Sequence, residues 1–477
     1  MNLAEKTIVR LKKKITFQYN HKRIENALCL MTSMAELQYL YNQQYKDDFL
    51  ESIIKEIADL NKEGIKHHLD NEAVLFYDGF GLDNRGLVQI YLKALSSIGY
   101  KIIYVTQAKK KESQPQVMLI VNKDGNHIYN YSGQSMIEKI QWLDHIAEKH
   151  AFSNAFFYTT PWDVPGTIAF EHLEKKCTRY QINLTDHAFW LGVNAFDFSL
   201  EFRNYGAAIS RDYRGLSEKK LLYLPYYPIV RNDIEFQGFS FNTKGKKIIF
   251  SGGAIYKTID KSNTFYFLIE QIILQHEDVV FVYASDKSSN QLDMLVNKYP
   301  NQIFWIKERK DLIQVLKHSY LYLNTYPISG ALMLQYAAIA GCIPVTLRRL
   351  WDDDASGILR YEEELGETFY SIDTVLNEIN KLLSDDNYYK SKKSKLVGQV
   401  ITELEFNELL NSILNNPSFN LIEKIYEVDT SMFIQTYREN ISEREIVGAV
   451  INSKVKRNIF NFPDFALKRL IMKLKRE

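Results

Sequence analysis

The chain has 477 residues, which is enough for two or three domains. Hydrophobic residues make up 46% of it, and 59 Lys and Arg against 58 Asp and Glu leave a net charge of +1. A balance this close to neutral argues against a dedicated nucleic-acid binder, because such proteins carry a strongly basic surface.

The three cysteines, Cys29, Cys177 and Cys342, are too far apart in the sequence for a zinc knuckle or a disulfide framework. Residues 1–14 lack the apolar core of a secretory signal, and no run of eighteen apolar residues occurs anywhere. We therefore expect a cytoplasmic protein without a transmembrane helix.

Helical periodicity dominates residues 1–68, where apolar residues recur every three or four positions and Pro and Gly are almost absent. We expect a helical N-terminal region over this range.

Residues 69–228 alternate short apolar runs with amphipathic stretches. Such alternation is typical of a parallel, doubly wound sheet. We expect a Rossmann-like domain here, with strands at 73–77, 102–105, 117–121, 155–158 and 180–184.

Residues 229–375 repeat this pattern, with helices at 265–274 and 330–340, the second ended by Gly341 as a C-cap. The sequence thus predicts an α/β protein with two Rossmann-like doubly wound domains facing a ligand cleft. The expected strands of this second domain are 247–250, 279–283, 303–306, 320–323 and 342–346.

Residues 376–477 return to helical periodicity, and the tail 461–477 alternates Phe, Leu and Ile with Lys and Arg. The tail suits a basic amphipathic helix on an anionic membrane surface. An ordinary helix packed against the N-terminal domain is the alternative, and we favour it slightly.

The strongest functional signal is a strand, a tight turn and a helix start at residues 323–333. Ser329 is a natural N-cap, and Gly330 lets the backbone approach a ligand closely. The amides at such a helix start favour an anion, for example the diphosphate of a nucleotide sugar. A Ser-Gly helix start is also common in helices that bind nothing.

A second signal is the loop 250–257, in which Ser251 and Gly252 follow a strand and Lys257 comes last. One ammonium group can offset charge on a leaving diphosphate without a metal. A solvated lysine is the competing interpretation.

A third signal is the segment 183–192, where an apolar strand gives way to Asp186 and His187. Ligands of open α/β sheets bind at this strand edge, and histidine suits proton transfer near neutral pH. We predict His187 as a general base with Asp186 beside it; a histidine that only caps the turn is the alternative.

A fourth signal is the glycine-containing loop 79–86, which does not have the spacing of a dinucleotide fingerprint. We expect Gly81, Asp83, Asn84 and Arg85 to lie in a loop that faces the ligand cleft. In the GT-B glycosyltransferases that the chain resembles, as described below, the equivalent loop contacts the acceptor or the donor sugar, and this resemblance implies an acceptor loop here.

Asp352, Asp353 and Asp354 have the Asp-x-Asp spacing of metal-dependent glycosyltransferases. We interpret them as a solvated charged loop, and we expect neither a metal site nor a cofactor.

Residues 247–347 resemble the donor domain of GT-B glycosyltransferases, and most closely the branch that contains O-GlcNAc transferase and bacterial cytoplasmic N-glucosyltransferases. The shared features are the Tyr326-Pro327 pair, the small-residue turn, the helix and a Gly-x-Pro-Val-like strand at 341–345. The resemblance implies a nucleotide-sugar donor, with Lys257 on its phosphates. The implied donor-binding residues are Ser251, Gly252, Lys257, Tyr326, Ser329, Gly330, Ala331 and Leu332.

One position departs from this pattern. Retaining GT-B enzymes carry two glutamates eight positions apart, and the matching residues here are Ile328 and Tyr336. The missing first glutamate favours an inverting mechanism, and Tyr336 puts ribose contact by a carboxylate on this helix in doubt.

We therefore expect sugar transfer from a UDP-linked donor to a saccharide or lipid-linked saccharide in bacterial surface glycan synthesis, at the inner face of the cell membrane. A protein acceptor, a non-catalytic partner of an active transferase, and a nucleotide-sugar epimerase are the alternatives.

Overall fold

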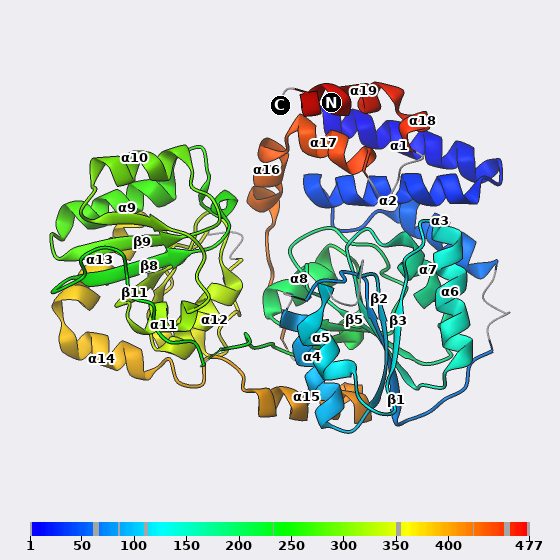
Figure 1. Ribbon diagram of the computed structural model, residues 1–477, viewed down its shortest axis with the longest axis horizontal. Coiled ribbons are helices and arrows are strands. Elements are labelled where there is room, and N and C mark those ends of the chain that lie inside the picture. Colours follow the sequence, from blue (N-terminus) through cyan, green and yellow to red (C-terminus); the bar gives the residue numbers. More distant parts are fainter. Residues whose placement is uncertain are drawn as a thin grey trace. The chain divides into compact units, whose positions relative to one another are not determined.

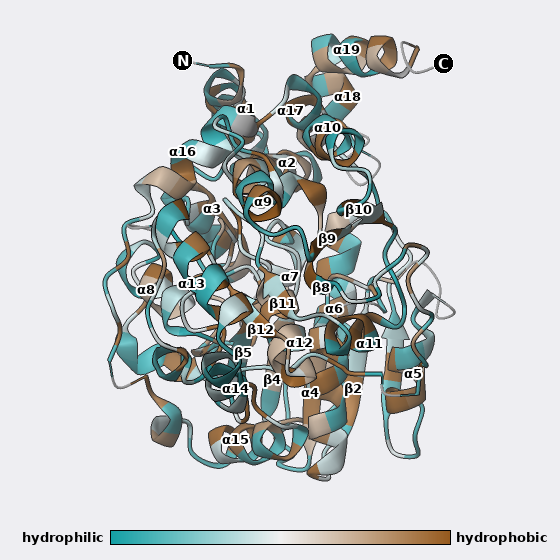
Figure 2. Ribbon diagram, turned by 90° about the vertical axis from the view of Figure 1, so that its left-hand side faces the viewer, coloured by the Kyte–Doolittle hydropathy of each residue, from teal (hydrophilic) through white to brown (hydrophobic). Residues whose placement is uncertain are grey.

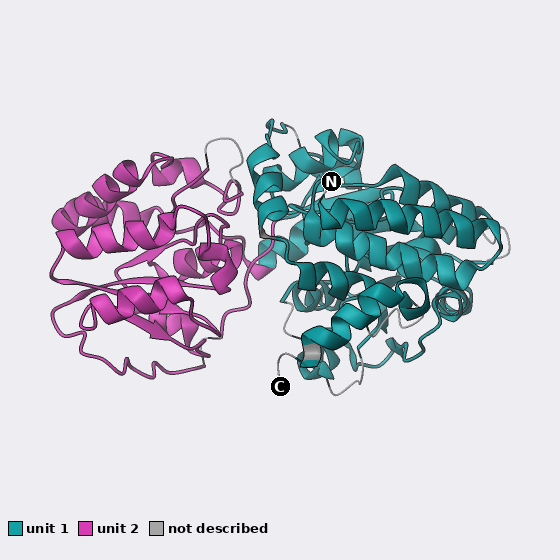
Figure 3. Ribbon diagram, turned by 90° about the horizontal axis from the view of Figure 1, so that it is seen from above, with its two compact units in different colours: residues 1–224, 404–477 teal, residues 225–403 magenta. Residues whose placement is uncertain are grey.

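The computed structural model describes residues 2–60, 66–83, 86–108, 113–231, 233–349, 354–422, 424–452 and 458–474. The chain divides into two compact units, Met1–Leu224 with Leu404–Glu477 (unit 1) and Pro225–Glu403 (unit 2), shown in Figure 3. These units differ from the four ranges expected above, because residues 376–403 belong with the second sheet and residues 404–477 with the first.

Unit 1 contains a seven-stranded parallel sheet in the order β3-β2-β1-β4-β5-β6-β7. Helices cover both faces: on adjacent residues of β1, Phe76 packs near Tyr91 of α4 and Tyr77 near Phe170 of α7. The strands are β1 (Ala73–Asp78), β2 (Lys101–Thr106), β3 (His127–Asn130), β4 (Asn154–Tyr158), β5 (Thr178–Ile182), β6 (Phe198–Glu201) and β7 (Leu221–Tyr223). The helices are α4 (Gly86–Ser97), α5 (Pro115–Val121), α6 (Met136–Lys149), α7 (Val164–His172) and α8 (Asn204–Asp212).

The two ends of the chain meet in a helical layer of unit 1 (Figure 1). One apolar core joins the first helices to the last ones, with Leu11 and Leu30 on one side and Val450 and Phe462 on the other. The helices of this layer are α1 (Leu3–Asn20), α2 (Ile24–Tyr41), α3 (Asp48–Asp59), α16 (Ser431–Asn440), α17 (Glu443–Val450), α18 (Asn458–Asn461) and α19 (Pro463–Leu474). The helix α15 (Glu403–Asn415) lies elsewhere in unit 1, where Phe406 is close to Tyr91 of α4.

Unit 2 contains a five-stranded parallel sheet in the order β10-β9-β8-β11-β12. Its central strands β8 and β9 are predominantly apolar (Figure 2), with α9 and α13 on one face and α11 and α12 on the other. The strands are β8 (Lys247–Gly252), β9 (Val279–Ala284), β10 (Ile303–Ile306), β11 (Leu321–Leu323) and β12 (Ile343–Val345). The helices are η4 (Ile255–Thr258), α9 (Thr264–Gln275), α10 (Asn290–Lys298), α11 (Leu312–Lys317), α12 (Ala331–Ala340), α13 (Ile372–Ser384) and α14 (Asp386–Ser394).

The strand expected at 117–121 is wrong, since this segment is the C-terminal part of α5. Pro115 occupies the first helical turn, where its missing amide costs nothing. Val117, Ile120 and Val121 are buried while Leu119 is exposed, which is the periodicity of a helix and not of a strand. Three strands, β3, β6 and β7, were not predicted.

Among the described residues, no helix is both long enough and apolar enough to cross a membrane.

Candidate active site

The carboxyl edge of the unit 2 sheet brings two predicted signals together. Tyr322 of β11 pairs with Phe250 of β8, so the residues that follow each strand leave the sheet side by side. In open α/β sheets this edge is where ligands bind. The loop that follows Gly252 therefore lies beside the turn that begins at Asn324.

The Asn324 side chain organises the turn before α12. Its Oδ1 accepts hydrogen bonds from the amides of Thr325 and Gly330, each at 3.0 Å. Gly330 is the N-cap, and a Cβ there would lie 3.2 Å from Asn324 Oδ1. The prediction that Ser329 is the N-cap is wrong, because the N-cap is Gly330 and the Ser329 hydroxyl donates to the Asp354 carboxylate.

The first turn of α12 presents unpaired amides. The N–H groups of Ala331, Leu332 and Met333 have no hydrogen-bond acceptor among the described residues. The first amides of any helix lack partners within the helix, and the dipole adds positive potential at this end. This helix start can therefore hold an anionic group such as a phosphate.

Lys257 links the two neighbouring loops. It lies in η4, and its Nζ donates to the carbonyl oxygen of Ser329 at 3.0 Å. In the reverse direction, the Ile328 amide donates to the carbonyl oxygen of Lys257 at 3.2 Å. The ammonium group is thus held at the residue that precedes the N-cap of α12.

The remaining predicted donor residues occupy different positions around this turn. Ser251 is fully buried, and its Oγ has no hydrogen-bond partner in the part of the chain described. A Cβ on Gly252 would lie 3.1 Å from the carbonyl oxygen of Ala284, so this position suits a glycine. Tyr326 packs against the core on the α9 face instead of pointing away from the protein.

Asp354 contacts this turn from a later segment of the chain, a contact that the sequence did not predict. Its carboxylate accepts from the Ser329 amide and from the Ser329 hydroxyl, each at 2.9 Å. Arg349 Nη2 lies 3.4 Å from the same carboxylate. The interpretation of Asp354 as a solvated loop residue is wrong; Asp352 and Asp353 lie outside the described residues.

Tyr336, which matches the second glutamate of retaining enzymes, makes a structural contact. The Tyr336 hydroxyl donates to the carbonyl oxygen of Ile229 at 3.0 Å. One position earlier, Gln335 is buried, and its Nε2 donates to the carbonyl oxygen of Tyr226 at 2.9 Å. Both side chains attach α12 to the segment that precedes β8.

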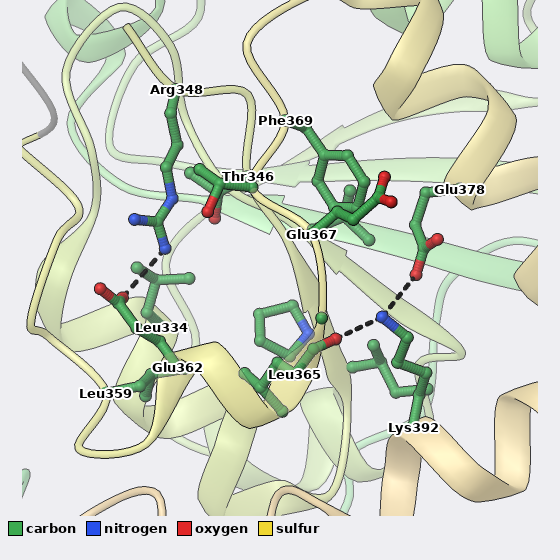
Figure 4. Close-up of a pocket in the computed structure, with 15 residues that line it drawn as sticks. Leu334, Thr346, Arg348, Leu359, Glu362, Leu365, Glu367, Phe369, Glu378 and Lys392 are labelled. Carbon is green, nitrogen blue, oxygen red and sulfur yellow. Dashed lines mark hydrogen bonds and ion pairs between the residues drawn. The ribbon is translucent and has the colours of Figure 1, made fainter. Parts of the chain in front are cut away.

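A small cavity of about 60 Å³ lies between β12, α12 and the segment 359–369 (Figure 4). Four of the charged groups that line it form two pairs, Arg348 with Glu362 at 2.9 Å and Lys392 with Glu378 at 3.2 Å, and Glu367 lines it as well. This volume holds a few water molecules at most. None of the predicted donor residues lines it.

In unit 1, the Asp186 carboxylate lies between a guanidinium and an imidazole. Its Oδ2 accepts from Arg203 Nε at 2.6 Å, and its Oδ1 lies 3.2 Å from His187 Nδ1. Burial opposes ionisation, but the Arg203 charge and the hydrogen bonds hold the pKa of Asp186 well below its ordinary value. Asp186 therefore stays a carboxylate and can orient the His187 ring.

The His187 ring is accessible, with 33% of its side chain exposed, whereas Asp186 is 1% exposed. The loop that carries it is fixed, since Asn42 Nδ2 donates to the carbonyl oxygen of His187 at 3.2 Å and Asn42 Oδ1 accepts from the Phe189 amide. Nε2 of His187 has no hydrogen-bond partner within the described residues. This arrangement, a buried carboxylate on Nδ1 with Nε2 open, is that of a histidine positioned for proton transfer.

The predicted acceptor loop after β1 is partly described. Gly81 has φ +61°, and a Cβ there would lie 2.6 Å from the Ala108 amide nitrogen. Asp83 Oδ1 accepts from the Val117 amide at 2.9 Å, so this carboxylate caps α5. Asn84 and Arg85 lie outside the described residues.

A buried polar cluster that the sequence did not indicate supports this loop. Asp163 accepts from Lys139 Nζ at 2.7 Å, from the Tyr77 hydroxyl and from Thr159 Oγ1. Burial opposes its ionisation, yet Lys139 keeps the pKa of Asp163 below its ordinary value. A Cβ on Gly79 would meet Thr159 Oγ1 at 1.8 Å, so the two loops pack in direct contact.

No group of three or more His, Cys, Asp or Glu side chains within the described ranges is arranged to hold a metal ion.

Comparison with known proteins gives a likeness of structure only. No family model matches the chain, and no curated protein matches its sequence. A point mutant of the Thermobaculum terrenum O-GlcNAc transferase is similar, with a TM-score of 0.52, 11% identity, and coverage of 92% of this chain and 83% of that one.

Two shorter structures are similar as well. A putative UDP-N-acetylglucosamine 2-epimerase from Listeria monocytogenes has a TM-score of 0.52 at 12% identity, covering 75% of this chain and 99% of that one. A glycosyltransferase from Rickettsia africae has a TM-score of 0.51 at 10% identity, covering 72% and 98%. Together with the two parallel sheets, these likenesses show that the chain has the GT-B fold.

Proposed function

We propose that the chain is a glycosyltransferase that moves a sugar from a UDP-linked donor to a saccharide acceptor in bacterial surface glycan synthesis. The observation that carries the proposal is made in unit 2, where Lys257 Nζ donates to the carbonyl oxygen of Ser329, two residues before the first open amide of α12. Structural neighbours named as an O-GlcNAc transferase and a glycosyltransferase support it.

In this proposal the sheet of unit 2 binds the donor. The first amides of α12 and the Lys257 ammonium stabilise the negative charge that develops on the leaving nucleoside diphosphate. These groups supply the charge that a divalent metal supplies in other glycosyltransferases, so we propose a metal-independent reaction.

The sheet of unit 1 supplies the acceptor side. His187 Nε2 takes the proton of the acceptor hydroxyl, the acceptor oxygen attacks the anomeric carbon, and the bond to the diphosphate oxygen breaks. The histidine becomes an imidazolium, which the Asp186 carboxylate stabilises. A single displacement of this kind inverts the anomeric configuration, as the absence of a glutamate at Ile328 suggests.

The acceptor loop after β1 is proposed to contact the acceptor through Gly81, Asp83, Asn84 and Arg85. We place the protein in the cytoplasm, at the inner face of the cell membrane, where lipid-linked acceptors are available. A protein acceptor and a non-catalytic role beside an active transferase are the alternatives to this assignment.

An epimerase is a second candidate, since a structural neighbour is named as a putative UDP-N-acetylglucosamine 2-epimerase. Product analysis with donor alone separates the two: an epimerase yields an isomeric nucleotide sugar, and a transferase does not.

The first experiment is a thermal-shift screen of nucleotide sugars, because a bound donor stabilises the fold in proportion to the logarithm of its concentration. UDP-linked donors should raise Tm more than GDP- or CDP-linked ones. If no nucleotide raises Tm, the proposed donor site is wrong.

A further inference from the structure

The last helix, α19, combines a face that packs on unit 1 with an opposite face that is apolar and exposed. Its inward face packs through Phe465, which is 3% exposed, and through Met472. The tail is therefore a docked part of the fold.

Four apolar side chains lie on the opposite face of α19, and we call them the tail stripe. They follow the helical spacing i, i+3, i+4, i+7, which places them on one side of the helix. They are Leu467, Leu470, Ile471 and Leu474, with exposed fractions of 59%, 55%, 43% and 62%. Figure 2 shows brown apolar and teal polar residues along α19.

The tail stripe differs from the scattered exposed apolar residues that every protein has, because it is contiguous along one helix. Another exposed aromatic ring, Phe460, lies just before it in α18 and is 89% exposed. At 100° per residue, Lys468 falls next to Ile471 at one edge of the stripe.

Basic residues of α1 lie near α19, and two carboxylates of this region are held in ion pairs. Asp464 forms a bidentate ion pair with Arg10 of α1, and Glu443 forms an ion pair with Lys468. Lys14 of α1 lies 5.4 Å from the centre of the Phe462 ring, so α1 runs close to this end of the chain. Besides Arg10 and Lys14, α1 carries Lys6, Lys12 and Lys13 and only one acidic residue, Glu5.

We propose that the tail stripe of α19 is a docking surface for an anionic lipid bilayer. An apolar stripe with a lysine at its edge and the basic helix α1 nearby matches the interface of such a membrane, where acyl chains lie beneath negative headgroups. Since the inward face of α19 stays packed on α17 and α1, the helix binds flat on the membrane without leaving the fold.

The test is co-sedimentation of the full-length protein with vesicles. Phosphatidylcholine vesicles that contain phosphatidylglycerol should bind the protein at low salt, and pure phosphatidylcholine vesicles should bind it at least about tenfold less. Binding to the anionic vesicles should fall at about 0.5 M NaCl, because salt screens exposed charges.

The variant Leu467→Ser, Leu470→Ser, Leu474→Ser should lower binding to anionic vesicles at least about tenfold, since it removes three side chains that would enter the acyl layer. Its Tm should stay within a few degrees of the parent value, because these side chains are exposed. The matched control Val397→Ser, Leu404→Ser, Phe419→Ser removes three other exposed apolar side chains and should bind like the parent.

Three results would overturn the proposal: no binding of the parent protein to anionic vesicles, equal binding of the tail-stripe variant, or equal loss in the control. Sedimentation velocity tests whether a second copy of this chain, instead of a membrane, binds to the tail stripe. If the parent is a dimer that the tail-stripe variant dissociates, a second copy of this chain covers α19 and the lipid proposal is wrong.

Discussion

The Asp354 carboxylate accepts two hydrogen bonds from one residue, Ser329, through its amide and its hydroxyl, both at 2.9 Å. Ser329 directly precedes the N-cap of α12, so a negative charge of the protein itself lies at the helix start that we propose for the donor phosphates. Arg349, whose Nη2 lies 3.4 Å from this carboxylate, offsets part of the charge, and the remainder would repel a diphosphate.

The variant Asp354→Asn should therefore bind UDP more tightly, by about three- to tenfold, which corresponds to one partly screened like-charge contact. Asparagine can still accept from the Ser329 amide, so the turn should keep its geometry. Calorimetric titration with UDP measures the effect, and the gain should shrink as salt is raised. Weaker binding by the variant would mean that Asp354 orders the site instead of opposing the ligand.

Lys257→Ala should lower turnover by about 10²-fold or more, the scale of losing one preorganised partner of a developing charge. Steady-state kinetics at saturating donor measure this loss. The neighbouring lysine provides a matched control, since Lys261→Ala changes the same net charge outside η4. Unchanged turnover in Lys257→Ala, or an equal loss in Lys261→Ala, would remove Lys257 from the donor site.

Sugar transfer should proceed without a divalent metal. We expect full activity in EDTA, because Lys257 and the α12 amides supply the positive charge that the diphosphate needs. Activity that is abolished by EDTA and restored by Mg²⁺ or Mn²⁺ would assign a metal to this site, with Asp352, Asp353 and Asp354 as the first ligands to examine.

The raised pKa of Glu51 predicts that the free energy of unfolding depends on pH. Burial raises the pKa of this carboxyl from 4.5 to about 7, and its Oε1 accepts from the Gly192 amide at 2.8 Å. A folded-state pKa above the unfolded one contributes stability that is complete below pH 4.5 and is lost as pH rises to about 7. The loss is on the order of 3 kcal/mol.

Glu51→Gln should remove this pH dependence. Its free energy of unfolding should vary less than that of the parent between pH 5 and 7, and the variant should be the more stable protein at pH 8. Urea unfolding across this range measures the difference. A parent protein whose stability rises from pH 5 to 7 relative to the variant would show that Glu51 is ionised in the fold.

The sequence predicted both sheets because buried parallel strands are continuous apolar runs, as in β1 and β9. It missed β3, His127–Asn130, because this edge strand is half-exposed and polar. It predicted a strand at 117–121 because Val and Ile favour strands, and the helix-start preference of Pro115 was not taken into account. The pattern singled out Ser329 and Asp186, but it could not give their partners: Asp354 and Arg203 are distant in the sequence and become neighbours only through the fold.

His187 should act as the general base, and two structural observations support this prediction. The Asp186 carboxylate, kept ionised by Arg203, orients Nδ1, and the exposed ring leaves Nε2 open to an acceptor hydroxyl. His187→Ala should lower kcat by about 10²- to 10⁴-fold, the usual worth of positioned proton transfer. Donor affinity should hardly change, because the proposed donor groups all lie in unit 2.

The pH dependence of kcat separates a base from a structural residue. The parent should lose activity on the acidic side, where the base is protonated, and this limb should vanish in His187→Ala. Asp186→Asn should also lower kcat, because a neutral amide no longer stabilises the imidazolium. A His187→Ala protein that keeps most of its kcat, or that keeps the acidic limb, would show that another residue is the general base. Asp186 and Asp83 would be the next residues to test.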